Sequence, residues 1–178
     1  MRVLLIDAGF GLRLFKLAIV AFLTIMLSAC SSRTKPEARY SPRVVAPNQP
    51  VPIGGGRYKL GSPYVIRGVR YVPRNDPHYN RVGLASWYGA QFHGRETANG
   101  EVFDAGRISA AHKTLPLPSF VRITNLTNGR TVIARVNDRG PFVTGRIIDV
   151  SRAAAARLGF LREGTARVRV TYVGPAPL

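Results

Sequence analysis

The stretch Phe120–Asp138, with the sequence FVRITNLTNGRTVIARVND, predicts two β-strands joined by a short turn. Its two strand-like parts, Phe120–Leu126 and Thr131–Asp138, are rich in the β-branched residues that favour strands. The run Thr127–Arg130 between them contains an Asn-Gly pair, the strongest short hairpin signal, because both turn residues must take positive φ. We therefore expect an antiparallel hairpin in a β-rich domain.

Further local signals surround this hairpin. Residues Val82–Tyr88 are apolar and aromatic, and Thr165–Val173 alternates apolar with polar residues as a half-buried strand does. One helix is expected over Arg152–Leu158, because Ser151 is a good N-cap and Gly159 a good terminator. Several short strands with one small helix predict a mainly β domain built as a compact barrel.

The N-terminus has the pattern of an exported lipoprotein. Basic residues precede the apolar run Leu17–Leu27, which is too short to span a bilayer and suits a signal peptide. The only cysteine, Cys30, follows it directly after small residues. We predict a signal peptide over 1–29 and lipidation of Cys30, with a serine next to it that favours the outer over the inner membrane. The alternatives are a secretion signal followed by a chance cysteine, and an uncleaved anchor.

Composition divides the rest of the chain into three parts. Residues 30–56 hold the lipidated cysteine and a linker rich in proline and glycine, which we expect to be extended, mobile and disordered. Residues 57–81 form an N-terminal arm packed on the domain, with two short strands around Arg67-Gly68. The barrel domain is placed at 82–174.

The charge of the chain limits its partners. It has 26 basic and 9 acidic residues, a formal net charge of +17. Nucleic-acid-binding domains are also basic, but export removes nucleic acid as a partner. The polyanions outside the cytoplasm are lipid head groups and the cell wall. Solubility and general surface attraction would explain the charge equally well.

The chemistry that the chain can perform rests on its carboxylates. No HExxH or paired-cysteine pattern occurs, so neither a metal nor another cofactor is expected. Asp138 is the best candidate, because it has the same parity along its strand as Val132, Ala134 and Val136. At the edge of that apolar face, partial burial would raise its pKa, as a general acid needs, while Arg139 would oppose the shift. The alternative is a carboxylate that caps the following turn.

Other candidates have weaker support from the residues alone. Glu101 and Asp104 lie in a glycine-rich loop, where carboxylates are usually just solvated. His112 would ordinarily be a satisfied polar residue, and the pair Trp87-Tyr88 is more often core than a platform for sugar rings. Asp149 precedes the helix cap, and we expect it to serve that helix end.

Five segments closely resemble the rare lipoprotein A (RlpA) family over residues 82–173. In chain order they are ASWYG (85–89), TANGEVFD (97–104), AHKTLP (111–116), VNDRGPF (136–142) and RIIDVS (146–151). The resemblance implies a six-stranded double-psi β-barrel with one or two short helices, similar to the barwin-like domains of expansins and family-45 endoglucanases. Many relatives add a C-terminal SPOR domain, and we expect none here, because the chain ends at Leu178.

The resemblance also implies an activity. It is lytic transglycosylase cleavage of peptidoglycan between N-acetylmuramic acid (MurNAc) and N-acetylglucosamine (GlcNAc) on strands poor in stem peptides. Asp138 would be the acid/base, Glu101 and Asp104 its carboxylate partners and His112 the functional histidine. We expect glycan contacts from a further set: Trp87, Tyr88, Asn137 and Arg139. The alternatives are a wall-binding or division-accessory lipoprotein without turnover, with possible divisome partners, and an expansin-like loosener.

Overall fold

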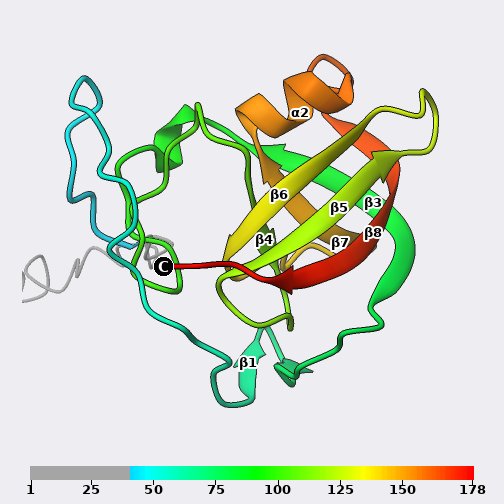
Figure 1. Ribbon diagram of the computed structural model, residues 1–178, viewed down its shortest axis with the longest axis horizontal. Coiled ribbons are helices and arrows are strands. Elements are labelled where there is room, and N and C mark those ends of the chain that lie inside the picture. Colours follow the sequence, from blue (N-terminus) through cyan, green and yellow to red (C-terminus); the bar gives the residue numbers. More distant parts are fainter. Residues whose placement is uncertain (1–40) are drawn as a thin grey trace, which may run out of the picture. The chain divides into compact units, whose positions relative to one another are not determined.

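The computed structural model describes residues 41–178, so the predicted signal peptide and Cys30 lie outside the described residues. Six strands close into a barrel in the order β3-β7-β4-β6-β5-β8 (Figure 1). The pairs β3–β7 and β4–β6 are parallel and the other four are antiparallel. The strands are β3 (Asn80–Tyr88), β4 (Ser109–His112), β5 (Ser119–Asn125), β6 (Thr131–Asp138), β7 (Arg146–Ser151) and β8 (Thr165–Pro175).

This closed barrel confirms the mainly β, six-stranded architecture. The sequence predicts β3, β5, β6 and β8 within two residues at each end, whereas β4 and β7 carry no comparable local signal. Closure leaves the barrel no exposed strand edge. Within residues 41–178, no helix is long and apolar enough to cross a membrane.

The barrel interior is filled by aliphatic side chains from alternate positions of the strands. Branched side chains suit this interior, because they pack closely against their neighbours in adjacent strands. On the adjacent strands β6, β5 and β8, the fully buried side chains are Val121, Ile123, Ala134, Val136, Val168 and Val170. This core fixes the ends of the strands. The candidate site residues lie at those ends or in the loops that connect them.

The predicted helix is confirmed as α2 (Arg152–Leu158), and a short 3₁₀ turn, η1, covers Ala90–Phe92. The Ser151 hydroxyl accepts a hydrogen bond from the amide of Ala154 at 3.2 Å, as an N-cap does. Gly159 ends the helix with a left-handed φ of 74°.

The β5–β6 hairpin is present, but its turn differs from the predicted one. Gly129 has a φ of 72°, whereas Asn128 is not among the described non-glycine residues with positive φ. The prediction that both turn residues take positive φ is wrong, because the loop between Asn125 and Thr131 is longer than a two-residue turn. The amide of Gly129 closes the loop by donating to the carbonyl of Asn125 at 2.8 Å.

The same loop stabilises the end of α2, which lies beside the hairpin in Figure 1. The side-chain amides of Asn125 and Asn128 each donate to the carbonyl of Leu158 at 3.0 Å. Helix ends leave carbonyls without intrahelical partners, so these two donors act as a C-cap supplied by a distant hairpin.

The arm is confirmed as a hairpin that packs on the barrel. Strands β1 (Tyr64–Ile66) and β2 (Val69–Tyr71) are antiparallel, and the turn residues between them have φ values of 50° and 77°. Tyr64 stacks on Tyr71 with ring centroids 5.2 Å apart, and both rings contact Phe142 in the loop after β6. The arm therefore contacts the segment that follows Asp138.

Residues 41–56, assigned above to the linker, differ from the free, extended segment that their composition predicts. The amides of Val44 and Val45 donate to the carbonyl of Gly94 at 2.8 and 3.1 Å, and Val51 is buried. Arg107 donates to the carbonyls of Val51 and Pro52. Many backbone carbonyls of a proline-rich segment have no partner within the segment. Here a loop of the barrel domain donates hydrogen bonds to some of them, so the segment is held against the domain. The domain boundaries themselves stay predictions.

We predict that Asn125→Ala lowers the free energy of unfolding by about 2 kcal/mol, because it leaves a buried carbonyl with fewer donors. Urea denaturation followed by circular dichroism measures the change. Asn128→Ala is the control, since Asn128 is exposed, and it should cost less. Equal stability of Asn125→Ala and the unchanged chain would contradict the capping role of the hairpin loop.

Candidate active site

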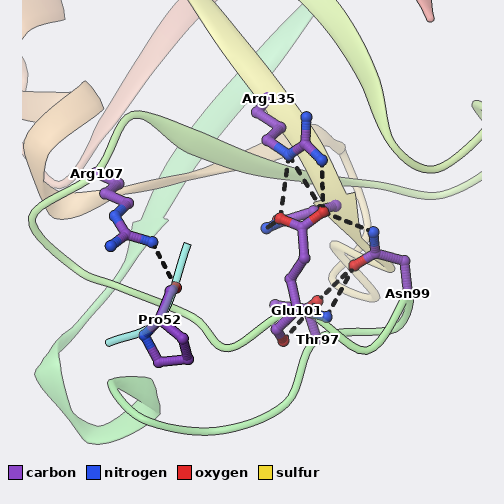
Figure 2. Close-up of polar contacts among 7 residues, drawn as sticks. Pro52, Thr97, Asn99, Glu101, Arg107 and Arg135 are labelled. Atoms are coloured by element: carbon purple, nitrogen blue, oxygen red, sulfur yellow. Dashed lines mark hydrogen bonds and ion pairs between the residues drawn. The ribbon is translucent and has the colours of Figure 1, made fainter. Parts of the chain in front are cut away.

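Glu101 lies at the centre of a network of polar contacts with Arg135 and Asn99 (Figure 2). Its side chain is buried (7% exposed) and forms a two-pronged ion pair with Arg135, at 2.7 Å from Nη2 to Oε1 and 3.0 Å from Nε to Oε2. The amides of Asn99 and Asn137 donate to the same carboxylate at 2.8 and 2.9 Å. Burial alone would raise the pKa of Glu101, but Arg135 and the two amides hold it below its ordinary value.

The local sequence Thr97–Glu101 forms the tight turn that presents this carboxylate. The amide of Thr97 donates to the carbonyl of Glu101, and the Thr97 hydroxyl donates to Asn99 Oδ1, both at 2.8 Å. Gly100 has a φ of 92°, which favours glycine. The chain also passes very close at Gly56, where a Cβ atom would lie 2.8 Å from Glu101 Cγ.

Asp138 lies at the end of β6 and is partly buried. Its Oδ1 accepts hydrogen bonds from the backbone amides of Ala98 (2.9 Å) and Arg139 (2.7 Å). Within residues 41–178, its Oδ2 accepts no hydrogen bond. Burial raises the pKa of Asp138, although the two amides and the charges of Arg139 and Lys59 act against the shift. The hydrogen bond from the Arg139 amide is the turn-capping contact that the alternative interpretation of Asp138 predicts. It uses only Oδ1, so Oδ2 remains available for a reaction.

The strict two-residue period does not extend to Asp138. Val136 pairs with Ala110 on β4, whereas Asp138 pairs with Ala111, so a register shift leaves Asn137 without a partner there. Asn137 is itself buried and binds Glu101. The register shift therefore determines which way the side chains at the end of β6 face. Strict alternation along the strand does not predict their directions.

Glu101 and Asp104 share one pocket of about 280 Å³, which Arg135 and Asn137 also line. Asp138 is not among the lining residues, so it is linked to this pocket through its neighbour Asn137.

Asp104 is held locally. Its Oδ1 accepts the amide of Gly106 at 2.8 Å, and its Oδ2 lies 3.3 Å from Nε of Arg107. The His93 ring nitrogen Nδ1 is 3.7 Å from Oδ1. The side chain is 22% exposed and remains open to the pocket.

His112 is placed in the wall of the barrel and is 3% exposed. Its Nδ1 accepts the backbone amides of Thr114 (3.2 Å) and Leu115 (3.1 Å), and its ring edge packs on Tyr79. Burial, with the charges of Arg139 and Lys113, lowers the pKa of His112 to about 3. The imidazole is therefore neutral at physiological pH and holds a turn, rather than donating a proton as an acid.

The predicted glycan-contact residues are mostly engaged within the protein. Arg139 donates to the carbonyls of Leu115 (2.6 Å), Leu60 (2.7 Å) and His112 (3.3 Å), so its guanidinium joins the arm to the barrel.

The two aromatic candidates fit the core interpretation better than an exposed platform. Trp87 is partly buried against the core, and Tyr88 contacts Phe92 and Phe103. The Tyr88 hydroxyl is buried without a hydrogen-bond partner among the described residues, and burial raises its pKa.

The expectation for Asp149 is wrong. It lies within β7, accepts the Ser86 hydroxyl at 2.8 Å and pairs with Arg146 at 3.5 Å. Burial raises the pKa of Asp149, although Ser86 and Arg146 act against the shift. Ser151 alone caps the helix, because parallel pairing of β3 with β7 turns Asp149 towards Ser86.

Sequence reasoning missed three residues that build the site: Asn99, Arg135 and Lys59. Lys59 Nζ donates to the carbonyl of Ala98 at 2.8 Å, next to Asp138. A half-buried arginine in a strand of apolar residues is a signal for a buried acidic partner, and it would have pointed to Arg135. Lys59 gives no such signal. Within residues 41–178, no group of three or more acidic, histidine or cysteine side chains gathers as a metal site requires.

Comparisons with known proteins match the part of the chain that forms the barrel. A family model described as lytic transglycolase matches residues 80–170. The protein named endolytic peptidoglycan transglycosylase RlpA from Pseudomonas aeruginosa is 55% identical over 127 residues, which cover 71% of this chain and 37% of that protein. The protein of the same name from Rickettsia bellii is 43% identical over 163 residues, covering 88% and 72%. The chain thus spans little more than a third of the Pseudomonas relative.

Two solved structures are similar to 56% of the chain. Streptomyces papain inhibitor (SPI) has a TM-score of 0.46 and 24% identity, with 99% of that chain covered. An apo-expansin from Clavibacter michiganensis has a TM-score of 0.43 and 19% identity, with 52% covered. The family match covers half of this chain, and the Rickettsia relative is covered over more than two thirds of its length. The family model and the Rickettsia relative, together with the closed six-stranded barrel, show that the chain belongs to the RlpA family of lytic transglycolases, with a double-psi β-barrel.

Proposed function

We propose that this chain is an endolytic peptidoglycan lytic transglycosylase. It cleaves the bond between MurNAc and GlcNAc in strands poor in stem peptides, leaves a 1,6-anhydroMurNAc end, and acts in wall remodelling and daughter-cell separation. The observation that carries the proposal is Asp138, a partly buried carboxylate with a raised pKa and an unbonded Oδ2. Relatives at 43–55% identity that bear the name endolytic peptidoglycan transglycosylase support it.

The proposed reaction needs one proton donor and no water. Protonated Asp138 gives its proton to the oxygen that bridges the two sugars while the bond from that oxygen to MurNAc C1 breaks. The C6 hydroxyl of the same MurNAc then attacks C1 and forms the 1,6-anhydro ring. Its proton passes to the Asp138 carboxylate, which restores the enzyme for the next cleavage.

The remaining predicted residues take supporting roles in this proposal. Glu101 stays ionised, and through Asn137 and the 97–101 turn it positions the peptide amide that bonds Asp138. To Asp104, which is open to the pocket, the proposal assigns the stabilisation of positive charge on the sugar. His112 positions the turn whose carbonyls bind Arg139.

The proposed location follows from the N-terminal sequence. Lipidation of Cys30 would tether the chain on the periplasmic side, at the outer membrane rather than the inner. The excess of basic residues would favour contact with anionic lipid and wall surfaces, and proteins of the division machinery are possible partners.

We predict that Asp138→Asn lowers cleavage of peptide-free glycan strands at least about 100-fold, the usual share of general acid–base catalysis. Mass spectrometry of 1,6-anhydro-muramyl products measures it. Glu163→Gln, an exposed acid on the loop before β8, is the matched control and should keep full activity. If the unchanged chain binds glycan but releases no anhydro products, the wall-binding or expansin-like alternatives replace this proposal.

The raised pKa of Asp138 predicts the pH dependence of the rate. A general acid must be protonated, so kcat/KM should be highest at acidic pH and fall as pH rises through the Asp138 pKa. The midpoint should lie above 3.8, the ordinary aspartate value. Rates on glycan strands from pH 3 to pH 8 measure it, and a midpoint at or below the ordinary value would contradict the assignment.

We predict that Glu101→Gln destabilises the protein, by about 3 kcal/mol, because it leaves the partly buried Arg135 without its counter-charge. Thermal and urea unfolding measure the loss, with Asp138→Asn for comparison. Because the folded-state pKa of Glu101 is lowered, this stabilisation is present above its unfolded pKa and is lost as pH falls through the folded value. Unchanged stability would show that the ion pair contributes nothing net.

A further inference from the structure

Lys59 belongs to the N-terminal arm, yet its side chain reaches Ala98, the residue whose amide bonds the candidate acid. Its backbone is fixed by two hydrogen bonds with Leu117, one in each direction, at 2.6 and 2.9 Å. Its Nζ donates to the carbonyl of Ala98 at 2.8 Å, and the amide of Ala98 donates to Asp138 Oδ1 at 2.9 Å. The ammonium and the carboxylate therefore bind opposite sides of a single residue.

This ammonium forms no direct ion pair in the part of the chain that the structure describes, although its charge acts on the nearby Asp138. Two other cations near the candidate site are paired with carboxylates, Arg135 with Glu101 and Arg107 with Asp104. The Arg139 guanidinium uses its donors on three backbone carbonyls. Within residues 41–178, no carboxylate oxygen lies within 4.0 Å of Lys59 Nζ, although the side chain is partly buried. An ammonium has three donors, and one of them is used here. A partly buried cation with spare donors favours an anionic group from a ligand.

We propose that Lys59 binds a carboxylate of the glycan beside Asp138, namely the lactyl carboxylate of a MurNAc residue without a stem peptide. The inference rests on the proposed function, which places that sugar at the acid. The lactyl group is ionised when free and becomes a neutral amide when a stem peptide is attached. Lys59 would thus determine specificity for strands whose peptides have been removed.

The geometry also allows a purely structural role, in which Lys59 only holds the Ala98 carbonyl. The two roles differ in their dependence on substrate charge. A structural loss weakens binding of every glycan, whereas loss of a charge contact weakens only binding of strands with free carboxylates. Lys59→Met keeps the length of the side chain and removes its charge, and Lys59→Arg keeps the charge.

The test is a binding measurement with the full chain carrying Asp138→Asn, which prevents turnover. One probe is a peptide-free glycan oligomer, and the other is the same oligomer with its lactyl carboxylates converted to methylamides. The control is Arg70→Met, which removes one exposed charge from the same arm. Calorimetry at low ionic strength gives Kd for each pair, since salt screens partly exposed charges.

We expect the Asp138→Asn chain to bind the free-carboxylate oligomer about tenfold more tightly than the amidated one, the size of one charge-assisted hydrogen bond. Lys59→Met should abolish this difference, while Lys59→Arg and Arg70→Met keep it. The proposal is overturned if the Asp138→Asn chain binds the two oligomers equally well, or if the difference survives Lys59→Met. An equal loss of affinity for both oligomers in Lys59→Met, with the difference kept, would show a structural role instead. Because the readout is binding, failure of the unchanged chain to form anhydro products would count against the proposed function alone.

Discussion

The buried ion pair between Glu101 and Arg135 is the constraint on which the rest of the site depends. A carboxylate that is 7% exposed stays ionised only if its partners compensate for lost solvation, and here Arg135, Asn99 and Asn137 do so. These partners join the 97–101 turn to β6. That junction brings the amide of Ala98 within 2.9 Å of Asp138. The position of the candidate acid thus depends on the hydrogen bonds and ion pair of a second carboxylate.

The surroundings of Glu101 and Asp138 shift the pKa values of these two carboxylates in opposite directions. Burial dominates at Asp138 and raises its pKa, whereas direct bonds from Arg135 and two amides outweigh burial at Glu101 and lower its pKa. In the proposed mechanism, such a division gives the proton to Asp138 and the permanent charge to Glu101. His112, with a pKa lowered to about 3, is outside this division and stays neutral.

Segments before the barrel contribute to the site as much as the barrel does. The 41–56 segment passes against Glu101 at Gly56, and Lys59 reaches the residue that bonds Asp138. Arg139 donates to the carbonyl of Leu60, so the arm is fixed to the segment that follows the acid. In the proposed setting, the part of the chain nearest the lipid tether is also part of the substrate-binding surface.

Local sequence signals were enough to predict α2 between Ser151 and Gly159, the β5–β6 strands, the arm hairpin and the motifs that carry the family resemblance. Capping, turn formation and strand periodicity act within a few residues, so they can be recognised without the fold. The register shift before Asp138, the long-range partners of Glu101 and Asp149, and the position of Lys59 could not be predicted locally, because they depend on how the barrel closes. The contacts of Lys59 with Ala98, Ser86 with Asp149 and Arg135 with Glu101 join residues 39, 63 and 34 positions apart. Burial of a charge is tolerated only where the fold brings its partner.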